Sequence, residues 1–529
     1  MAAGTGRGAL IVGLDAGTSA IKAVAFDLAG HEVASASRRN AYDIGADGAV
    51  TQPMARTFDD CAAVLRDLGA QIEGFAARVA ALGVTGQGDG TWLLDGAGAP
   101  VGDGLLWLDV RAAAIVRTMT RTEADRARFA ATGTGLTACQ QGPQLRFLAE
   151  RHPEAIARAA TALHCKDYIH LRLTGVRATD PCEAAFSFGN FRTRDYDDAV
   201  IAALGLAPLR HLLPPVLDGA GTTHPLLPEA AVATGLRAGT PVALGYLDAA
   251  CTALGAGVFE GGRGHGCTIV GSTGVHMKAV PAEAVVLTPE PTGYVLVLPV
   301  PGIVAQMQTN MAGTLNLDWI LGVGAGLLRD LGLGEADLIG ALDRWLDAAL
   351  PGGPLYQPYV SPAGERGPFV DPAARAGFVG LETRHGFAHL VRAVAEGMGH
   401  AARDCYGAMG GVPAEVRLTG GAARSGALTA LWAAGLGARL RPSRRAEAGA
   451  TGAAMIAATA VGAFGSMQDA IAGWVTPWLG AAVEPDPALA ATLARRFEDH
   501  LAARRALGPV WARMAGGDGA ADRGEGGGA

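Results

Sequence analysis

A short polar loop between two apolar strands, near the start of the chain, places the strongest constraint on the fold. Both segments, Leu10–Leu14 and Ile21–Phe26, are mostly apolar, with little alternation between apolar and polar side chains, and are rich in branched residues. This pattern predicts buried strands. In the loop between them, Gly17 permits a tight turn and leaves room for a ligand. Thr18 and its neighbours offer hydroxyl and N–H donors for a polyphosphate, and Asp15 offers a carboxylate for hydrated Mg²⁺. By itself the pattern fits an ordinary hairpin with a polar tip equally well.

A second loop of the same kind begins the second half of the chain. Gly271-Ser-Thr-Gly274 lies between the expected strands Cys267–Val270 and Val275–Val280. Two such loops, each heading a similar half, indicate a duplicated ββ-loop domain. This arrangement resembles the sugar kinase, actin and Hsp70 superfamily, in which a nucleotide lies between two lobes. We therefore expect an α/β, duplicated ribonuclease H-like fold of the actin/hexokinase/Hsp70 superfamily, with two lobes and a central cleft.

Composition narrows the class of protein. The chain has 529 residues, is 50% hydrophobic and carries a formal charge of −7, which predicts several domains and no electrostatic footprint for nucleic acid. The seven cysteines form no CxxC pair and suit buried, reduced thiols. Residues 1–8 lack a signal-peptide core, and the longest apolar stretch, Tyr294–Met307, is interrupted by Pro299 and Pro301. We expect a soluble cytoplasmic protein with no membrane or nucleic-acid partner.

Two common ATP-binding scaffolds are excluded by the basic residues. The only lysines are Lys22, Lys166 and Lys278, and none follows glycine and precedes serine or threonine as a Walker-type loop requires. The His-Arg-Asp and Asp-Phe-Gly motifs of protein kinases are also missing. If the chain uses ATP, it does so on another scaffold.

Further elements follow from periodicity and turn residues. We expect a third strand at His31–Arg38, a helix at Met54–Ala77, a hairpin formed by Thr91–Leu94 with Leu105–Asp109, and a disordered tail at Gly516–Ala529. Helical material is expected between residues 111 and 175. Later helices are expected at Glu335–Leu350, Phe387–Met409, Gly426–Gly435 and Ala450–Ala463.

Five segments in the same order and spacing resemble the FGGY family of carbohydrate kinases, over about residues 9–465. They are Gly13–Ser19, Gly245–Gly257, Gly271–Gly274, Gly364–Arg375 and Leu418–Ser425. The resemblance implies an N-terminal domain at 9–255, which holds the acceptor, the first phosphate motif and the catalytic residue. It also implies a C-terminal domain at 256–505 with the second phosphate and adenosine motifs, followed by a tail at 506–529.

The resemblance implies ATP-dependent phosphorylation of an alcohol, with Asp248 as the general base. Asp248 stands where an expected strand runs into a helix, and without the resemblance a helix N-cap is the simpler interpretation. Asp15 and Asp248 are the expected Mg²⁺ residues, acting through water. The expected ATP-binding residues are Asp15, Gly17, Thr18, Ser19, Gly271, Ser272, Thr273, Gly274, Gly420, Gly421, Ala422 and Ser425.

The acceptor loop, Thr85–Trp92, differs from two better-known branches of the family. It lacks the histidine of typical xylulokinases and the arginine of glycerol kinases. Asp89 can accept hydrogen bonds from two neighbouring hydroxyls, which suits a polyol. Within the family the loop most resembles that of erythritol kinases, so we expect a terminal hydroxyl of a small polyol, erythritol above others, as the acceptor. The expected substrate-binding residues are Gln87, Asp89, Trp107, Asp109, Arg111 and Asp248.

Alternatives remain at this stage. Trp107, Asp109 and Arg111 are equally well explained as a core tryptophan and a helix-capping ion pair. The acceptor can instead be a ketopentose, as in xylulokinases or ribulokinases. A less favoured reading is an actin- or Hsp70-like ATPase. We interpret Trp92 and Lys166-Asp-Tyr168 as structural and expect no metal at the histidines. A homodimer is compatible with the resemblance.

Overall fold

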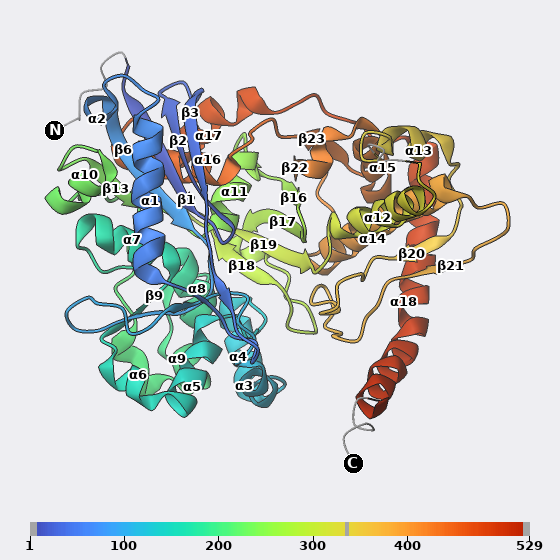
Figure 1. The fold of residues 1–529 in the computed structure, drawn as a ribbon, viewed down its shortest axis with the longest axis horizontal. Helices are drawn as coiled ribbons and strands as arrows, with labels where there is room; N and C mark the ends of the chain where they lie inside the picture. Colours follow the sequence, from blue (N-terminus) through green and yellow to red (C-terminus); the bar gives the residue numbers. More distant parts are fainter. Residues whose placement is uncertain (1–7, 334–337, 522–529) are drawn as a thin grey trace.

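The computed structural model describes residues 8–333 and 338–521. Two six-stranded sheets form its framework, one in each half of the chain (Figure 1). The first has the order β12-β13-β6-β1-β2-β3 and the second β18-β19-β17-β16-β22-β23. Apart from the edge strands β12 and β18, the two orders correspond when one is reversed, because three antiparallel strands (β3-β2-β1 and β19-β17-β16) are followed by two parallel ones (β6-β13 and β22-β23). The matching order confirms the expected duplication.

The first sheet places its polar loop at the end of its central strand. Its strands are β1 (Leu10–Ala16), β2 (Ala20–Asp27), β3 (Glu32–Arg39), β6 (Val79–Gly86), β12 (His224–Pro225) and β13 (Pro241–Leu244). Strands β1 and β2 pair in register through Asp15 opposite Lys22. In the parallel direction, Asp15 lies opposite Thr85 of β6. The first polar loop and the start of the acceptor loop therefore leave the sheet side by side.

The second sheet repeats this arrangement. Its strands are β16 (Gly266–Val270), β17 (Gly274–Pro281), β18 (Tyr294–Val297), β19 (Ile303–Asn310), β22 (Glu415–Gly420) and β23 (Arg439–Pro442). Val270 pairs with Gly420 in parallel register, so the second polar loop and the expected adenosine motif begin next to one another. Strand β18 lies at one edge of the sheet.

Helices from both halves cover the first sheet. Helix α1 (Met54–Gly69) packs on β1, β2 and β3, whereas α16 (Ala448–Ala460) packs on β1 and β6 and also contacts α11 (Asp248–Ala256) (Figure 1). The contact with α16 is very close, because a Cβ on Gly13 would overlap the Ala450 carbonyl and one on Gly83 would overlap the Ala453 carbonyl. Helix α16, which belongs to the second half of the sequence, thus packs on the first sheet.

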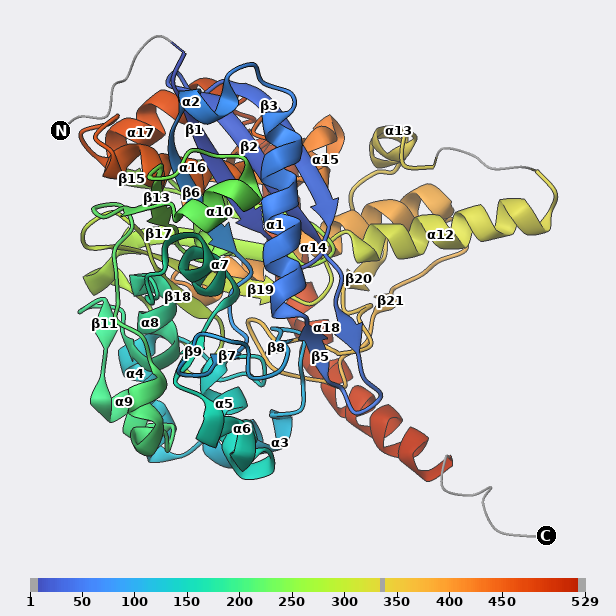
Figure 2. The same ribbon diagram turned by 60° about the vertical axis from the view of Figure 1, so that its left-hand side comes forward.

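The second sheet has its own helical layer. It comprises α12 (Leu315–Asp330), α13 (Leu342–Ala348), α14 (Phe387–Ala408), α15 (Gly426–Leu436) and α18 (Pro487–Ala521). Helices α14 and α15 pack together, and α18 packs on both. Figure 2 shows α12 and the end of α18 projecting from the body of the molecule. Helix α17 (Met467–Trp474) packs against α16.

A largely helical insertion completes the first domain (Figure 1, lower left). Its helices are α3 (Ala113–Met119), α4 (Glu123–Thr132), α5 (Gln141–Arg151), α6 (Pro153–Arg158), α8 (Pro181–Phe188) and α9 (Asp198–Ala203). Helix α2 (Phe75–Arg78) directly precedes β6, α7 (Cys165–Thr174) packs on β6 and β13, and α10 (Pro228–Thr234) packs on α1. Short strands are β4 (Asp43–Ile44), β5 (Val50–Gln52), β7 (Trp92–Leu94), β8 (Gly104–Leu105), β9 (Thr161–Leu163), β10 (Gly189–Asn190) and β11 (Asp195–Tyr196). The second domain adds the pairs β14 (Phe259–Glu260) with β15 (Arg263–Gly264) and β20 (Leu355–Gln357) with β21 (Gly377–Val379).

Two sequence predictions were wrong in detail. The expected hairpin does not form as such, because β7 pairs with β9 and β8 pairs with β5, leaving only a bridge between Thr91 and Leu105. After Leu94 the chain turns sharply, and Leu94 forms a bridge with Pro100. This prevents a longer ladder between Thr91–Leu94 and Leu105–Asp109. The helix expected at Met54–Ala77 ends at Gly69, since the left-handed Gly74 (φ 67°) interrupts it before α2.

The tail prediction was also wrong in part. Helix α18 continues to Ala521, anchored by Trp511, whose ring lies 5.5 Å from that of Tyr359; residues 522–529 lie outside the described part of the chain. Within the helix expected at Glu335–Leu350, α13 forms, and residues 334–337 lie outside the described part of the chain.

All seven cysteines are buried free thiols, as expected. None of the described helices has the length and apolar character needed to span a bilayer.

Candidate active site

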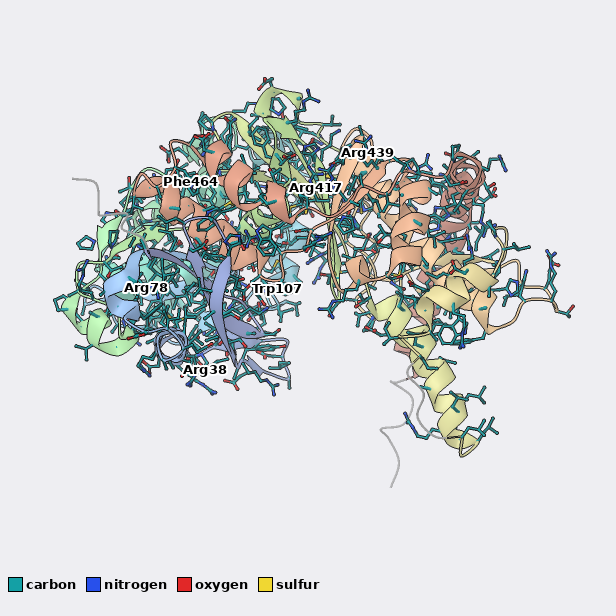
Figure 3. The ribbon with its side chains drawn as sticks, turned by 90° about the horizontal axis from the view of Figure 1, so that it is seen from above. Arg38, Arg78, Trp107, Arg417, Arg439 and Phe464 are labelled. Atoms are coloured by element: carbon teal, nitrogen blue, oxygen red, sulfur yellow. The ribbon has the colours of Figure 1, made fainter. Side chains whose placement is uncertain are left out.

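A cavity of about 220 Å³ lies between the two domains and gathers many of the predicted residues. Its wall includes Thr18, Asp89, Trp107 and Asp248 from the first half of the chain, and Thr273 and Arg366 from the second. Trp107 lies on the side of the first domain that faces the second (Figure 3). The two polar loops, the acceptor loop and the start of α11 thus meet at one place.

Asp248 is the first residue of α11 and lies half-buried in this wall. Leu247 occupies the N-cap position, and among the described residues Asp248 Oδ1 accepts a hydrogen bond only from the adjacent N–H of Ala249, at 2.6 Å. Burial, followed by the negative charge of Asp15, raises the pKa of Asp248 to about 7. Its position therefore differs from that of a simple helix cap, and its carboxylate suits proton transfer near neutral pH.

Asp15 approaches the N-terminus of α16. Burial raises the pKa of Asp15 to about 6, with Lys22 opposing the shift and Glu447 adding to it. Lys22 Nζ and Glu447 Oε2 form an ion pair of 2.8 Å. A Cβ on Gly449 would lie 2.5 Å from Asp15 Oδ2, so the carboxylate fits only against a glycine. Its Oδ1 is buried and accepts no hydrogen bond from the described residues, which is costly unless a ligand supplies a donor.

The two carboxylates fit a magnesium ion that arrives with a nucleotide. Within residues 8–333 and 338–521, no group of three or more histidine, cysteine or acidic side chains is arranged to hold a metal by itself. Mg²⁺ usually keeps several waters and binds through one or two carboxylates together with phosphate oxygens. Asp15 and Asp248 offer that donor set, and each negative charge disfavours the other unless a cation is present.

The first polar loop is fixed by a chain of hydrogen bonds. Trp107 Nε1 donates to Thr18 Oγ1 at 2.7 Å, and Thr18 Oγ1 donates to Gln87 Oε1 at 3.0 Å. Gln87 Nε2 in turn donates to Gln52 Oε1 at 2.8 Å. Gln87 is buried behind Thr18 and does not line the cavity, so the structure places it as a support for this loop. The backbone of Gly17 is fixed as well, because its carbonyl accepts a hydrogen bond from Asn40 Nδ2 at 2.8 Å.

The exposed parts of both polar loops remain open to a ligand. Ser19 is exposed, and so are Gly271 and Ser272 in the second loop. Thr273 lines the cavity, and Gly274 is buried at the start of β17. The N–H groups of Gly313 and Thr314 donate to the carbonyls of Ser272 and Gly271, at 2.7 and 2.8 Å. These bonds hold the backbone of the second loop and leave its hydroxyls available.

A second cavity, of about 520 Å³, adjoins the expected adenosine motif. Gly421 and Ser425 line it together with Asp318, Asp343 and Arg424. Gly420 has a φ of 91°, and a Cβ there would lie 2.5 Å from the Val270 carbonyl. Ala422 lies in the 3₁₀ turn Gly421–Arg424 that follows. Ser425 Oγ accepts from the Leu428 N–H as the cap of α15 and donates to Asp343.

Asp89 is brought to the first cavity in an unusual backbone conformation. Its φ is 54°, in the left-handed region that side chains other than asparagine and aspartate seldom adopt. Its Oδ2 accepts from the Tyr294 hydroxyl at 2.9 Å and from Cys139 Sγ at 3.5 Å, whereas Oδ1 is buried without a partner among the described residues. Burial raises the pKa of Asp89.

Asp109 and Arg111 lie apart from this cavity. Arg111 Nη2 donates to Asp109 Oδ2 at 2.7 Å, and the buried Asp109 carboxylate also accepts from the Val50 N–H at 3.1 Å. The Arg111 guanidinium lies 5.2 Å from the Phe147 ring centre and lines a separate surface cavity. Of the three residues in this motif, the structure brings only Trp107 to the cavity, and the ion pair supports the neighbouring backbone.

Sequence reasoning missed the contribution of the second domain to the acceptor side. Tyr294 and Thr309, from β18 and β19, line the cavity beside Arg366. Arg366 Nε donates to Thr309 Oγ1 at 2.9 Å, which holds the guanidinium at the wall. Arg366 belongs to the segment Gly364–Arg375, which resembles a family segment, but the resemblance assigns no role to this arginine. Nothing in the local sequence around Tyr294 distinguishes it from any other strand tyrosine.

A fully buried ion cluster lies behind the acceptor loop. Lys166 Nζ contacts Asp167 Oδ1 at 2.5 Å and Asp180 Oδ2 at 2.6 Å, and His164 Nε2 lies 3.4 Å from Glu183 Oε2. The carboxylates raise the pKa of Lys166 despite its burial, and the charge of Lys166 weakly opposes the rise in the pKa of Asp248. The Lys166-Asp-Tyr168 segment is therefore buried with its charges paired, and Lys166 still acts electrostatically on Asp248 in the cavity wall.

Comparison with known proteins agrees with this geometry. The FGGY family of carbohydrate kinases matches by its N-terminal domain over residues 10–255 and by its C-terminal domain over 268–461. Erythritol kinase of Brucella abortus (strain 2308) is 56% identical over 97% of this chain and 99% of its own length. Xylulose kinase of Escherichia coli (strain K12) is 30% identical over 79% of this chain and 82% of its own.

A solved structure shows the same fold. The ligand-bound xylulose kinase from Lactobacillus acidophilus superposes with a TM-score of 0.86 at 22% identity, covering 96% of this chain and 99% of its own. The expected duplicated two-lobe fold is thereby confirmed. Both family domains match in order, and together they span most of the sequence. The chain therefore belongs to the FGGY family of carbohydrate kinases.

Proposed function

We propose that this carbohydrate kinase transfers the γ-phosphoryl group of ATP to a terminal hydroxyl of erythritol. The observation that carries the proposal is the pair of half-buried carboxylates, Asp89 and Asp248, in the wall of one small cavity that also contains Thr273 of the second polar loop. A small polyol can hydrogen-bond to Asp89 while one end faces Asp248. The similarity to the Brucella abortus erythritol kinase supports this acceptor.

Asp248 serves as the general base. An alcohol is a weak nucleophile, so its proton must be accepted as the bond to phosphorus forms. A carboxylate whose pKa is raised to about 7 remains largely ionised at slightly alkaline pH and is more basic than an ordinary aspartate. The proton moves from the acceptor oxygen to a carboxylate oxygen of Asp248, and the γ-phosphoryl group moves from ATP to the acceptor oxygen, which leaves ADP.

The two polar loops position the phosphates. The hydroxyls of Ser19, Ser272 and Thr273 would donate to phosphate oxygens, together with the backbone N–H groups of Thr18 and of the residues beside Gly17 and Gly271–Gly274. The Thr18 hydroxyl itself donates to Gln87. Mg²⁺, held through water by Asp15 and Asp248, would neutralise charge on the phosphates. The adenosine would lie in the second cavity, against Gly420, Gly421, Ala422 and Ser425. Enclosure between two domains would favour transfer to the alcohol over transfer to water.

A ketopentose is the second candidate acceptor. Arg366 lines the cavity and can donate hydrogen bonds to a carbonyl oxygen, and the relative from Escherichia coli is a xylulose kinase. The actin- or Hsp70-like ATPase has no such support, because the chain belongs to a carbohydrate kinase family. Asp109 and Arg111, which lie outside the cavity, are not proposed to bind the acceptor.

A coupled assay of ADP release tests the proposal. The purified chain is supplied with MgATP and with each member of a series of tetritols, pentitols and ketopentoses, and products are identified by mass spectrometry. We expect the highest kcat/KM with erythritol and a phosphorylated terminal carbon. A higher kcat/KM with a ketopentose, or ADP release that is indifferent to every acceptor, contradicts the proposal.

A further inference from the structure

The backbone around Asp89 is held in a defined but strained shape. Asp89 has a positive φ, and so does Gly90, at 76°. A Cβ on Gly90 would overlap the Leu105 carbonyl, and the Gly90 N–H donates to the Cys139 carbonyl at 2.9 Å. A residue other than glycine in this conformation costs free energy and persists only where surrounding contacts fix it. The carboxylate of Asp89 is therefore placed by the structure around it.

The residue that holds this carboxylate comes from the other domain. Tyr294 is the first residue of β18, the edge strand of the second sheet, which packs against α8 of the first domain (Figure 1). Hydrogen bonds to the first domain hold the backbone of the strand on both sides of Tyr294. Val295 N donates to Thr134 Oγ1 at 3.2 Å, and Gly135 N donates to the Gly293 carbonyl at 2.9 Å. The Tyr294 ring is thus fixed at the acceptor loop.

The two oxygens of the Asp89 carboxylate are in different situations. Oδ2 accepts from the Tyr294 hydroxyl and from Cys139 Sγ, whereas Oδ1 accepts nothing from the described residues although it is buried. A buried carboxylate oxygen without a donor is costly, and Asp89 belongs to the cavity wall. A ligand with a hydroxyl beside Oδ1 removes this cost, whereas a ligand with a carbonyl oxygen there does not, since two acceptors repel.

We propose that Tyr294 is a specificity-determining residue of the acceptor site, whose hydroxyl holds Asp89 as a hydrogen-bond acceptor and so selects a polyol over the corresponding ketose. The inference rests on the proposed function and deepens it. Tyr294 positions Asp89 and favours its ionised form, because a donated hydrogen bond stabilises a carboxylate. Without the tyrosine hydroxyl, burial favours the protonated carboxyl, which can donate to a carbonyl.

Tyr294→Phe tests the proposal with little change in shape. The ring keeps its edge-to-face contact with Phe186, at 5.5 Å, and loses only the hydroxyl. We measure kcat and KM for ATP, erythritol and the four-carbon ketose erythrulose. We expect the KM for erythritol to rise about tenfold or more, as the loss of a hydrogen bond to a charged group implies, the KM for ATP to stay within about twofold, and the preference for erythritol over erythrulose to fall. Tyr196→Phe, which removes a hydroxyl bonded to the Pro214 carbonyl away from the cavity, is the matched control.

Asp89→Asn provides an independent measurement if Tyr294→Phe does not fold. The amide keeps the shape and adds donors, so it should shift preference from erythritol toward erythrulose in the same direction. An unchanged erythritol KM and acceptor ranking in a folded Tyr294→Phe protein overturns the inference alone, provided that the wild type prefers erythritol. A wild type that prefers a ketopentose overturns the proposed function, and with it the polyol preference assigned to Asp89.

Discussion

Asp15 and Asp248 stand near the beginning and the end of the first domain, yet after burial the charge of Asp15 is the largest influence on the pKa of Asp248. Strand β1 ends beside the polar loop, and α11 begins just after the strand β13. The fold thus brings the charge of Asp15 within influence of Asp248, which lines the interdomain cavity, and a hydrated cation there would compensate both charges. Each carboxylate should therefore support activity and, in the protein without ligands, lower the stability of the fold.

Asp248→Asn should abolish phosphoryl transfer while ATP binding is retained. The amide cannot accept the proton of the acceptor alcohol, and loss of a general base typically lowers the rate by about 10²–10⁴-fold. Turnover is measured by the coupled assay, and ATP affinity by titration calorimetry with Mg²⁺ present. Wild-type turnover in the variant would mean that another group accepts the proton.

The same substitution should stabilise the protein without ligands at alkaline pH. Folding raises the pKa of Asp248 from its ordinary 3.8 to about 7, so the folded protein binds the proton more tightly than the unfolded chain does. Its contribution to stability is therefore lost as the pH rises from about 4 to about 7, at about 1.4 kcal/mol per pKa unit. We expect the Tm of Asp248→Asn to exceed that of the wild type at pH 8 and to approach it near pH 4.

Scanning calorimetry across this pH range checks the expectation. Glu498→Gln, at an exposed position on α18, is the control for loss of one acidic group. Saturating MgATP should reduce the advantage of Asp248→Asn at pH 8, because the cation compensates the carboxylate in the wild type. A difference in Tm that is constant from pH 4 to pH 8 would show that the Asp248 proton is not linked to folding.

Asp89→Ala should raise the KM for the polyol much more than the KM for ATP, because Asp89 lines the acceptor cavity and not the adenosine cavity. Asp109→Ala should act differently, since Asp109 lies outside that cavity and binds Arg111 and the Val50 N–H. For Asp109 we expect a lower Tm with similar KM values. Steady-state kinetics and thermal unfolding of both variants distinguish the two roles, and equal effects on the two KM values would move Asp89 out of the acceptor site.

Lys166→Met should destabilise the protein strongly. The substitution leaves Asp167 and Asp180 buried without their cation, and breaking a buried ion pair from one side typically costs about 3–5 kcal/mol. Lys22→Met removes a partly exposed pair with Glu447 and should cost about 1 kcal/mol or less. Urea unfolding compares the two variants, and similar losses would contradict the structural importance of the buried cluster.

The fold was predictable because its signals are local. The strands on either side of each polar loop are short apolar runs, and their recurrence in the second half implied the duplication before any contact was known. Asp248 was proposed as the base through the family resemblance, because the local pattern of a strand running into a helix fits a helix N-cap equally simply. The break of α1 at Gly69 and the return of Leu94 onto Pro100 depend on turn geometry that apolar periodicity does not reveal.

The acceptor site was predicted only in part because its second wall is nonlocal. Tyr294 reaches Asp89 through the docking of an edge strand, and Arg366 reaches the cavity through its bond to Thr309. Neither contact has a sequence signature. Conversely, Gln87 and Asp109 belong to motifs that pointed to the substrate, and both are buried as supports. Motif position therefore pointed to the region of the interdomain cavity, whereas tertiary packing decided which side chains line it.

Only glycine at positions 13 and 83 lets α16 approach the first sheet so closely, and this close packing has a consequence for biosynthesis. Helix α16, for which glycine at those two positions leaves room, leaves the ribosome long after β1 and β6, yet it packs on the sheet that these strands form. A nascent chain released after residue 255 would expose that apolar surface to water and to other chains. Expression of the two halves as separate genes should therefore yield pieces that aggregate apart and recover solubility only when they are produced together.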